Sequence, residues 1–339
     1  MTNKKDIPNN PSLFISSPFR SGSALLSRTL NAHSQIALLN DDIKYFRFIY
    51  NRYLPLREGN IIKMLNDIAC RLLKRFNMKL DVKACLCTIQ QQSIDEASIY
   101  STLLNYFLGD HQKKLIGEME SISWTNIPVF LNMYPEAKGL LIIRDLRDVV
   151  VSFKKKTIAP GCDYLIALFN VIDAMDHYLE YQIFFPECFY GVRFELLKEN
   201  PEREITKICS FLGLEYEEGM IDEENWTDYH GNKWKNREIS SFHEDADSMN
   251  PVGRWRRLIT PEELYLCEWI GCKQMKAFNM QFEGKSASQE VIDRAIEMLN
   301  SSELLREAFK NWEKTGKGVE KYPLDPTDPK TWDKNAMTT

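Results

Sequence analysis

Short apolar segments alternate with segments of helical periodicity along most of this chain, and no other feature of the sequence constrains the fold as strongly. The segments 13–16, 36–39, 114–118, 139–143 and 188–192 have the length and apolar character of buried strands. Strands that are separated by helices form mostly parallel sheets that are covered on both faces. The sequence therefore predicts an α/β fold around such a sheet.

One long helical stretch interrupts this alternation. Residues 44–110 have helical periodicity and no glycine-rich nucleotide loop, so we interpret them as a helical insertion or lid. Further along, the pattern predicts one helix over 261–278, with Thr260 as its N-cap, and another over 289–314. The length of 339 residues allows two domains or one α/β domain with insertions.

Composition narrows the class of protein. Hydrophobic residues make up 44% of the chain, which is enough for a sizeable core and argues against a disordered chain. The 43 basic and 48 acidic residues leave a net charge of −5, the wrong sign for a protein that coats nucleic acid. No apolar run is long enough to span a membrane. A polar N-terminus and eight cysteines without a C-x-x-C pair favour a cytoplasmic protein with reduced thiols and no zinc site.

The first of three candidate anion sites lies between the first predicted strand and the helix that follows it. A helix N-terminus offers unpaired N–H groups and a partial positive charge. Gly22 allows the backbone to curl around a ligand, and Ser21 and Ser23 supply hydroxyl donors. Arg20 can bind an anion through two parallel hydrogen bonds. The alternative is an ordinary strand–helix turn whose serines cap the helix, and the pattern G-x-x-x-x-G-K-[ST] is absent.

The second candidate site follows the fourth predicted strand. Arg144 stands at the carboxyl end of that strand, which is the end where doubly wound sheets bind ligands. Ser152 comes about two helical turns later and Lys156 one further turn along the same face, so this stripe suits a second phosphate. The alternative is a surface cluster of salt bridges between Arg144 and its charged neighbours.

A third basic cluster begins at Gly253, Arg254 and Trp255 and continues with two more arginines. An aromatic residue among arginines suits a phosphorylated nucleotide, or equally a single-stranded nucleic acid. The alternative is a solvated loop in which Trp255 packs into the core.

Together these segments resemble the motifs of sulfotransferases that use 3′-phosphoadenosine 5′-phosphosulfate (PAPS). The run PFRSGSALL at 18–26 is similar to their 5′-phosphosulfate loop, and RDLRDVVVS at 144–152 is similar to their 3′-phosphate motif. RFELL at 193–197 with FLGL at 211–214 looks like the stretch that follows in the family, and GRWRRL at 253–258 resembles its closing segment. The motifs occur in the family's order.

The resemblance implies a single α/β domain around a five-stranded parallel sheet, with a core over about 12–283, the lid over about 44–110, and a C-terminal helix and tail over 289–339. It also implies PAPS as cosubstrate, adenosine 3′,5′-bisphosphate (PAP) as product, and no metal. By motif position, the residues that would hold the 5′-phosphosulfate are Arg20, Ser21, Gly22, Ser23 and Ala24. Those that would hold the 3′-phosphate and the adenosine are Arg144, Ser152, Lys156, Phe194, Gly253, Arg254 and Trp255, and Phe194 stands where the family often has a tyrosine near the adenine.

Sulfuryl transfer requires an in-line arrangement and stabilisation of the charge that builds on the leaving oxygen. Arg20 is the candidate for the second task. Asp41 follows the second predicted strand, where tyrosylprotein sulfotransferases carry a catalytic glutamate, so the resemblance suggests it as the base that takes the acceptor's proton. Asp42 is the second candidate and Glu118, at the end of the third predicted strand, is the third. Met119 stands where many relatives have a lysine, so a second cation must come from elsewhere.

The sequence thus predicts a sulfotransferase that transfers a sulfuryl group from PAPS to a hydroxyl of a small alcohol, lipid or glycan. We expect acceptor specificity to lie in 44–110 and in the aromatic-rich segment 215–247. Two alternatives stay open: a P-loop-like kinase, disfavoured by the missing Gly-Lys-Ser/Thr and Mg²⁺-binding signals, and a non-catalytic module that binds a nucleotide or RNA, disfavoured by the net negative charge. Neither a nucleic-acid partner nor an integral membrane segment is expected, and the oligomeric state has no signature in the sequence.

Overall fold

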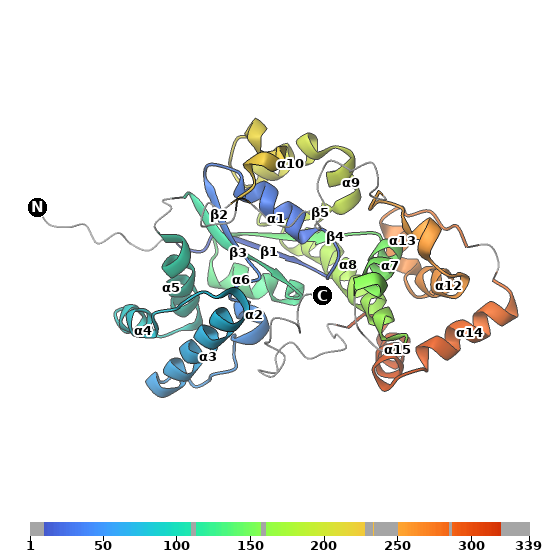
Figure 1. Cartoon of the computed structure of the whole chain (residues 1–339), viewed down its shortest axis with the longest axis horizontal. Coiled ribbons are helices and arrows are strands. Elements are labelled where there is room, and N and C mark those ends of the chain that lie inside the picture. Colours follow the sequence, from blue (N-terminus) through green and yellow to red (C-terminus); the bar gives the residue numbers. More distant parts are fainter. Residues whose placement is uncertain are drawn as a thin grey trace, which may run out of the picture.

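The centre of the molecule is one parallel sheet, seen in a computed structural model that describes residues 10–109, 113–156, 161–227, 233, 250–284 and 287–319. Its strands have the order β2-β3-β1-β4-β5 (Figure 1). All of the strand pairs are parallel, as the alternation of strands and helices predicted. The strands are β1 (Leu13–Ser17), β2 (Ile36–Asn40), β3 (Leu115–Ser121), β4 (Lys138–Ile143) and β5 (Phe189–Arg193).

Both faces of the sheet are apolar. Successive side chains of a strand point to opposite sides, and the central strands β1 and β4 are buried along almost their whole length. On one face, Ile15 and Leu140 pack with buried residues of α1 (Ser23–Asn31), α9 (Phe194–Glu199) and α10 (Pro201–Phe211). On the other face, Phe14 and Leu141 pack with buried residues of three helices: α6 (Ile127–Met133), α7 (Leu146–Lys156) and α8 (Ile166–Phe184). Figure 1 shows α1, α9 and α10 above the sheet and α6 and α8 below it.

The stretch expected to be a helical insertion is helical. Its buried apolar residues, including Ile61, Leu65 and Tyr100, belong to the same core cluster as Phe14 of β1. In Figure 1 these helices lie beside α6 at the β2 edge of the sheet. They are α2 (Tyr45–Phe48), α3 (Glu58–Phe76), α4 (Val82–Gln90) and α5 (Glu96–Leu108).

The C-terminal helices differ from the predicted ones in where they break. The helix expected over 261–278 is divided at Gly271, although Thr260 forms the expected cap, a capping box with Glu263. The helix expected over 289–314 is divided between Asn300 and Ser302, and Ser302 caps the second half. The helices after residue 250 are α11 (Trp255–Leu258), α12 (Pro261–Ile270), α13 (Cys272–Ala277), α14 (Gln289–Leu299) and α15 (Glu303–Thr315).

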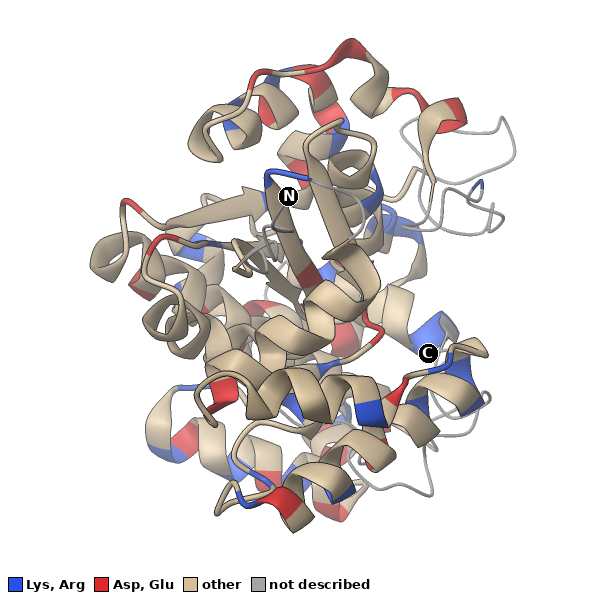
Figure 2. Cartoon of the chain, turned by 90° about the vertical axis from the view of Figure 1, so that its left-hand side faces the viewer, with Lys and Arg blue, Asp and Glu red and all other residues tan. Residues whose placement is uncertain are grey.

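Charged residues lie mostly on helices and loops, and the strands of the sheet are mostly uncharged (Figure 2). Within the described residues, no helix combines the length and apolar character that crossing a membrane requires. Short 3₁₀ segments complete the described elements: Trp124–Asn126, Asp163–Leu165, Glu218–Ile221 and Glu223–Asn225.

All five strands end at the same edge of the sheet because they are parallel, so the segments that follow them meet there. The third strand extends to Ser121, three residues beyond its predicted end at Glu118. Glu118 therefore lies inside the strand, and Ser121 occupies the edge. This difference decides which carboxylates reach the site.

Candidate active site

The loop between β1 and α1 has a backbone shape that depends on its glycine. Gly22 has a φ of 95° and precedes the first residue of α1, and Arg20 also has a positive φ, 66°. A Cβ atom on Gly22 would lie 2.3 Å from Cδ2 of Phe194. A side chain at this position would thus be strained by its backbone conformation and would also clash with the Phe194 ring.

The loop leads directly into the N-terminus of α1, whose first two residues are Ser23 and Ala24. The hydroxyl of Ser21 is buried and has no hydrogen-bond partner among the described residues. A buried hydroxyl without a partner is costly, and an oxygen of a bound anion would satisfy it. The loop therefore fits the anion cradle that its sequence indicates.

The second predicted motif lies directly against this loop. Arg20 Nε donates to Ser152 Oγ over 3.0 Å, and Arg144 Nη1 donates to the backbone oxygen of Arg20 over 3.1 Å. Arg144 also donates to the backbone oxygen of Pro251, just before the third motif. The three motifs, far apart in the sequence, thus meet at one edge of the sheet.

Three guanidinium groups converge here and oppose one another. Burial lowers the pKa of Arg144 to about 10, and the positive charges of Arg254 and Arg20 add to this effect. The pKa of Arg20 is lowered by burial and then by Arg254, and burial lowers the pKa of Arg254 too. Buried Nε of Arg254 has no partner among the described residues. A multiply charged anion would relieve this repulsion and pair with the free donor.

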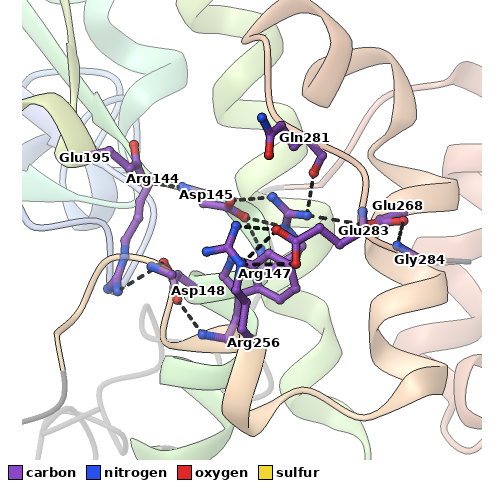
Figure 3. A network of polar contacts seen from close by, with 12 residues as sticks. Arg144, Asp145, Arg147, Asp148, Glu195, Arg256, Glu268, Gln281, Glu283 and Gly284 are labelled. Carbon is purple, nitrogen blue, oxygen red and sulfur yellow. Dashed lines mark hydrogen bonds and ion pairs between the residues drawn. The ribbon is translucent and has the colours of Figure 1, made fainter.

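Asp148 holds the third motif against the second (Figure 3). Its two carboxylate oxygens accept from the backbone N–H groups of Gly253, over 2.7 Å, and Trp255, over 3.0 Å. The same carboxylate lies 3.8 Å from Arg144 Nη2. Burial raises the pKa of Asp148, while Arg144 and the two N–H groups act in the opposite direction. One buried carboxylate therefore sets the position of the segment that carries Arg254.

The indole of Trp255 is enclosed by protein. The guanidinium carbons of Arg147 and Arg256 lie 3.9 Å and 4.7 Å from its ring centroid. Arg147 is in turn paired with Asp145 and Glu268, as Figure 3 shows. The ring thus serves to attach the segment to α7, and what it offers the candidate site is its backbone.

Phe194 is also fully buried, with no exposed surface. Its ring lies against Gly22, and the guanidinium carbon of Arg144 lies 4.6 Å from the ring centroid. The ring supports the loop and Arg144 from beneath. The family resemblance implies a position near the adenine; in this structure the ring follows β5 directly and is enclosed by the loop and Arg144.

Asp41 is the predicted base that reaches the edge of the sheet. It follows β2, and its side chain is one-quarter exposed, at 25%. Its oxygens accept from the N–H of Ser121 over 2.7 Å and from the hydroxyl of Ser121 over 2.8 Å. The ammonium of Lys44 lies 3.1 Å from Asp41 Oδ1. The carboxylate is thus held in one orientation at the ends of β2 and β3.

The other two predicted bases lie deeper. Asp42 is buried and accepts from the N–H of Asn40, and burial raises its pKa to about 7. Glu118 has no exposed surface and accepts from the N–H groups of Ile43 and Lys44 over 2.9 Å and 2.8 Å. Burial and then the nearby Glu120 raise the pKa of Glu118 well above its usual range. Asp42 thus holds the last residue of β2, and Glu118 holds the backbone that follows it.

The structure also brings residues to the site that the sequence analysis did not select. Lys44, Ser121 and Asp148 are the main ones. Asp148 is part of the charged motif after β4, but nothing in the sequence indicates that it accepts hydrogen bonds from the backbone of the third motif. A buried lysine after β2 and a serine at the end of an extended strand carry no pattern that would single them out.

Two further expectations concern the edges of the site. Lys156 is the last residue of α7, and its side chain lies outside the described part of the structure. Most of the segment 228–249, within the predicted specificity loop, also lies outside it. Among the described residues, no group of three or more His, Cys, Asp or Glu side chains is arranged to hold a metal ion.

Comparisons with known proteins identify similar folds and a family. The chain is similar in fold to the sulfotransferase domain from the Synechococcus PCC 7002 olefin synthase, with a TM-score of 0.54 and 19% identity over 83% of this chain and 99% of that one. It is similar to the sulfotransferase domain from the curacin biosynthetic pathway, with a TM-score of 0.53 and 17% identity over 81% of this chain and all of that one, 100%. No curated protein matches the sequence. A model of the sulfotransferase family matches residues 11–218, which include Asp41, the Arg144 motif and the loop between β1 and α1, called the anion loop below. The chain therefore belongs to the sulfotransferase family.

Proposed function

We propose that this sulfotransferase uses PAPS as donor and transfers its sulfuryl group to a hydroxyl of a small alcohol, lipid or glycan. The observation that carries the donor is the convergence of Arg144, which is buried, with the half-buried Arg20 and Arg254 beside a helix N-terminus. Such a cluster favours a ligand with several negative charges. PAPS carries them at both ends, on its 5′-phosphosulfate and its 3′-phosphate.

The proposed binding roles follow from position. The 5′-phosphosulfate is held by the loop and the first turn of α1, through Arg20, Ser21, Gly22, Ser23 and Ala24. The 3′-phosphate is held by Arg144, Ser152 and Arg254. Gly253 and Trp255 contribute through the backbone that Asp148 holds, and Phe194 contributes by supporting the loop.

The proposed reaction is an in-line displacement at sulfur. The bond between sulfur and the acceptor oxygen forms while the bond between sulfur and the bridging phosphate oxygen breaks. Arg20 neutralises the charge that develops on the bridging oxygen. Asp41 takes the proton of the acceptor hydroxyl, since it is the partly exposed carboxylate at the strand ends. Asp42 and Glu118 are buried and serve the backbone around Asp41.

We further propose that the described elements form a single domain, because the insertion and the C-terminal helices share one core cluster with the sheet. Ile61 of the insertion, Phe14 of β1 and Leu305 of α15 all belong to it. A separate substrate domain would have a core of its own.

The nucleotide specificity tests the proposed donor. Isothermal calorimetry with PAP, AMP and ATP should show much tighter binding of PAP. Arg144→Ala should remove the preference for PAP over AMP, because it deletes a cation assigned to the 3′-phosphate. The matched control is Arg294→Ala, an exposed arginine of α14 that pairs with Glu290. Comparable binding of PAP, AMP and ATP by the unmodified protein would reject PAPS as donor and favour a nucleotide-binding module or a kinase.

A further inference from the structure

Lys44 is a buried cation to which the reaction described above gives no role. Its side chain is 2% exposed, and its backbone has a φ of 52°. Glu118 accepts from its N–H, and Glu120 accepts from the N–H groups of Phe46 and Arg47 shortly after it. Two buried carboxylates of β3 thus fix the backbone that carries this lysine at the edge of the sheet.

The ammonium lies between the proposed base and the anion loop. It is 3.1 Å from Asp41 Oδ1 and 5.5 Å from the ring centroid of Phe19. Phe19 directly precedes Arg20 in the loop. The group therefore connects the end of β2, where the acceptor's proton is taken, with the loop that holds the donor.

Burial makes the positive charge of Lys44 costly, and nearby carboxylates offset part of that cost. Burial lowers its pKa, Arg71 of α3 acts in the same direction, and Asp41 and Glu120 oppose this. An ammonium has three N–H donors, and the recorded ion pair with Asp41 uses one of them. Among the described residues the ammonium has no second hydrogen-bond partner, so its other donors can bind an anion that arrives with the ligand.

Distances in the proposed reaction place the sulfuryl oxygens within reach. A base lies ~3 Å from the acceptor oxygen that it deprotonates. In a reactive complex that oxygen lies ~3–3.5 Å from the sulfur. An ammonium in contact with the base carboxylate can therefore reach an oxygen of the sulfuryl group when that group approaches from the anion-loop side.

We propose that Lys44 is a catalytic residue that binds an equatorial oxygen of the sulfuryl group, an inference that rests on the proposed function. It supplies the second cation that the residue after Glu118, a methionine, does not provide. Lys44 keeps its proton throughout: the acceptor proton goes to Asp41, and the electron pair of the broken bond stays on the bridging oxygen beside Arg20. The lysine stabilises charge on the group in transit.

The test compares the affinities of PAPS and PAP, which differ only in the sulfuryl group. Lys44→Met should raise the Kd for PAPS by ~10-fold or more, because a charge-assisted hydrogen bond is lost. The Kd for PAP should stay within ~2-fold, since PAP has no sulfuryl group for this residue to bind. Lys44→Arg, which keeps the charge, should preserve part of the preference for PAPS. Calorimetry without acceptor gives both constants.

The control is Lys154→Met on α7, a 41% exposed lysine paired with Glu263, which should change neither constant. Lys44→Gln provides a polar neutral variant if Lys44→Met does not fold. A parallel loss of PAP and PAPS affinity, or no loss at all, would overturn the role of Lys44. If the unmodified protein binds neither nucleotide, the proposed donor itself fails, which is a distinguishable result.

Discussion

Asp41 and Asp42 are neighbours in the sequence, yet their environments give them different chemistry. Asp41 is partly exposed; at the strand ends it accepts hydrogen bonds from Ser121 and forms an ion pair with Lys44. Asp42 is buried and shares its surroundings with Arg71 and Arg75 of α3. A one-residue step after a strand turns a side chain to another side of the backbone, so the two carboxylates diverge.

We predict that Asp41→Asn slows sulfuryl transfer ~10²–10⁴-fold, because an amide cannot accept the acceptor's proton. The Kd for PAP should remain within ~2-fold, since the anion loop is unchanged. Transfer of labelled sulfuryl from PAPS, with an acceptor found by screening, measures the rate, and calorimetry measures the Kd. An unchanged rate would move the base role to Asp42 or Glu118.

Asp42→Asn tests the pH dependence of stability. Its pKa is raised to about 7 in the folded protein by burial, against ~4 in an unfolded chain. Between these values the folded state retains a proton that the unfolded state has lost. The stability that this proton provides is complete below pH ~4 and is lost as the pH rises through about 7.

Asp42→Asn should therefore gain stability relative to the unmodified protein as the pH rises from 5 to 8, by up to ~1.4 kcal/mol per pH unit. Urea unfolding at several pH values measures this difference. Asp293→Asn, at an exposed position of α14, is the control and should show a constant difference. A constant difference for Asp42→Asn as well would show that burial does not shift this carboxyl.

At the scale of elements, contacts from α7 hold the other segments of the site in place at the edge of the sheet. The segment with Gly253 and Arg254 has little regular structure before α11, and Asp148 at the first turn of α7 holds it. The Asp145–Arg147–Glu268 network then connects α7 to α12. The role proposed for Arg254 therefore depends on α7, which keeps its segment in place.

We predict that Asp148→Asn lowers PAP affinity ~10-fold or more, because an amide cannot accept from both N–H groups and leaves a buried donor unpaired. The loss should not add to that of Arg254→Ala, since Asp148 acts through Arg254. Glu283→Gln is the control, because Glu283 pairs with Arg256 on the outer side of the same network. Calorimetry on the single and double variants measures the coupling, and additive losses would contradict it.

The elements also show where a local pattern stops being informative. Helical periodicity continues across Gly271, yet α12 ends at Ile270. Only glycine fits at 271, because a Cβ would lie 2.7 Å from Cys267 O and 2.7 Å from Leu146 Cδ2. The third strand was predicted to end at Glu118. β3 continues to Ser121, and the carboxylates of Glu118 and Glu120 accept hydrogen bonds from the backbone N–H groups of Ile43 and Arg47. Both outcomes depend on partners distant in sequence.

For the whole molecule, the single-domain proposal and the donor proposal lead to one measurement. Because a ligand that binds only the folded state stabilises all of one cooperative unit, PAP at 100 times its Kd should add ~2.7 kcal/mol. We predict one calorimetric unfolding transition that moves upward as a whole with PAP. AMP at the same concentration is the control and should shift it less. Two transitions of which only one moves would contradict the single domain.

The sequence by itself determined the α/β architecture, the helical insertion and the order of the motifs that we propose bind the donor, because strand and helix periodicity and strand–loop–helix motifs are local properties. Tertiary structure alone decided which side chains share the site. Asp148 with Gly253 and Lys44 with Phe19 are pairs separated by many residues that meet because parallel strands bring all their carboxyl ends to one edge. Burial at that edge, which no local pattern records, then set the pKa values of Arg144 and Asp42.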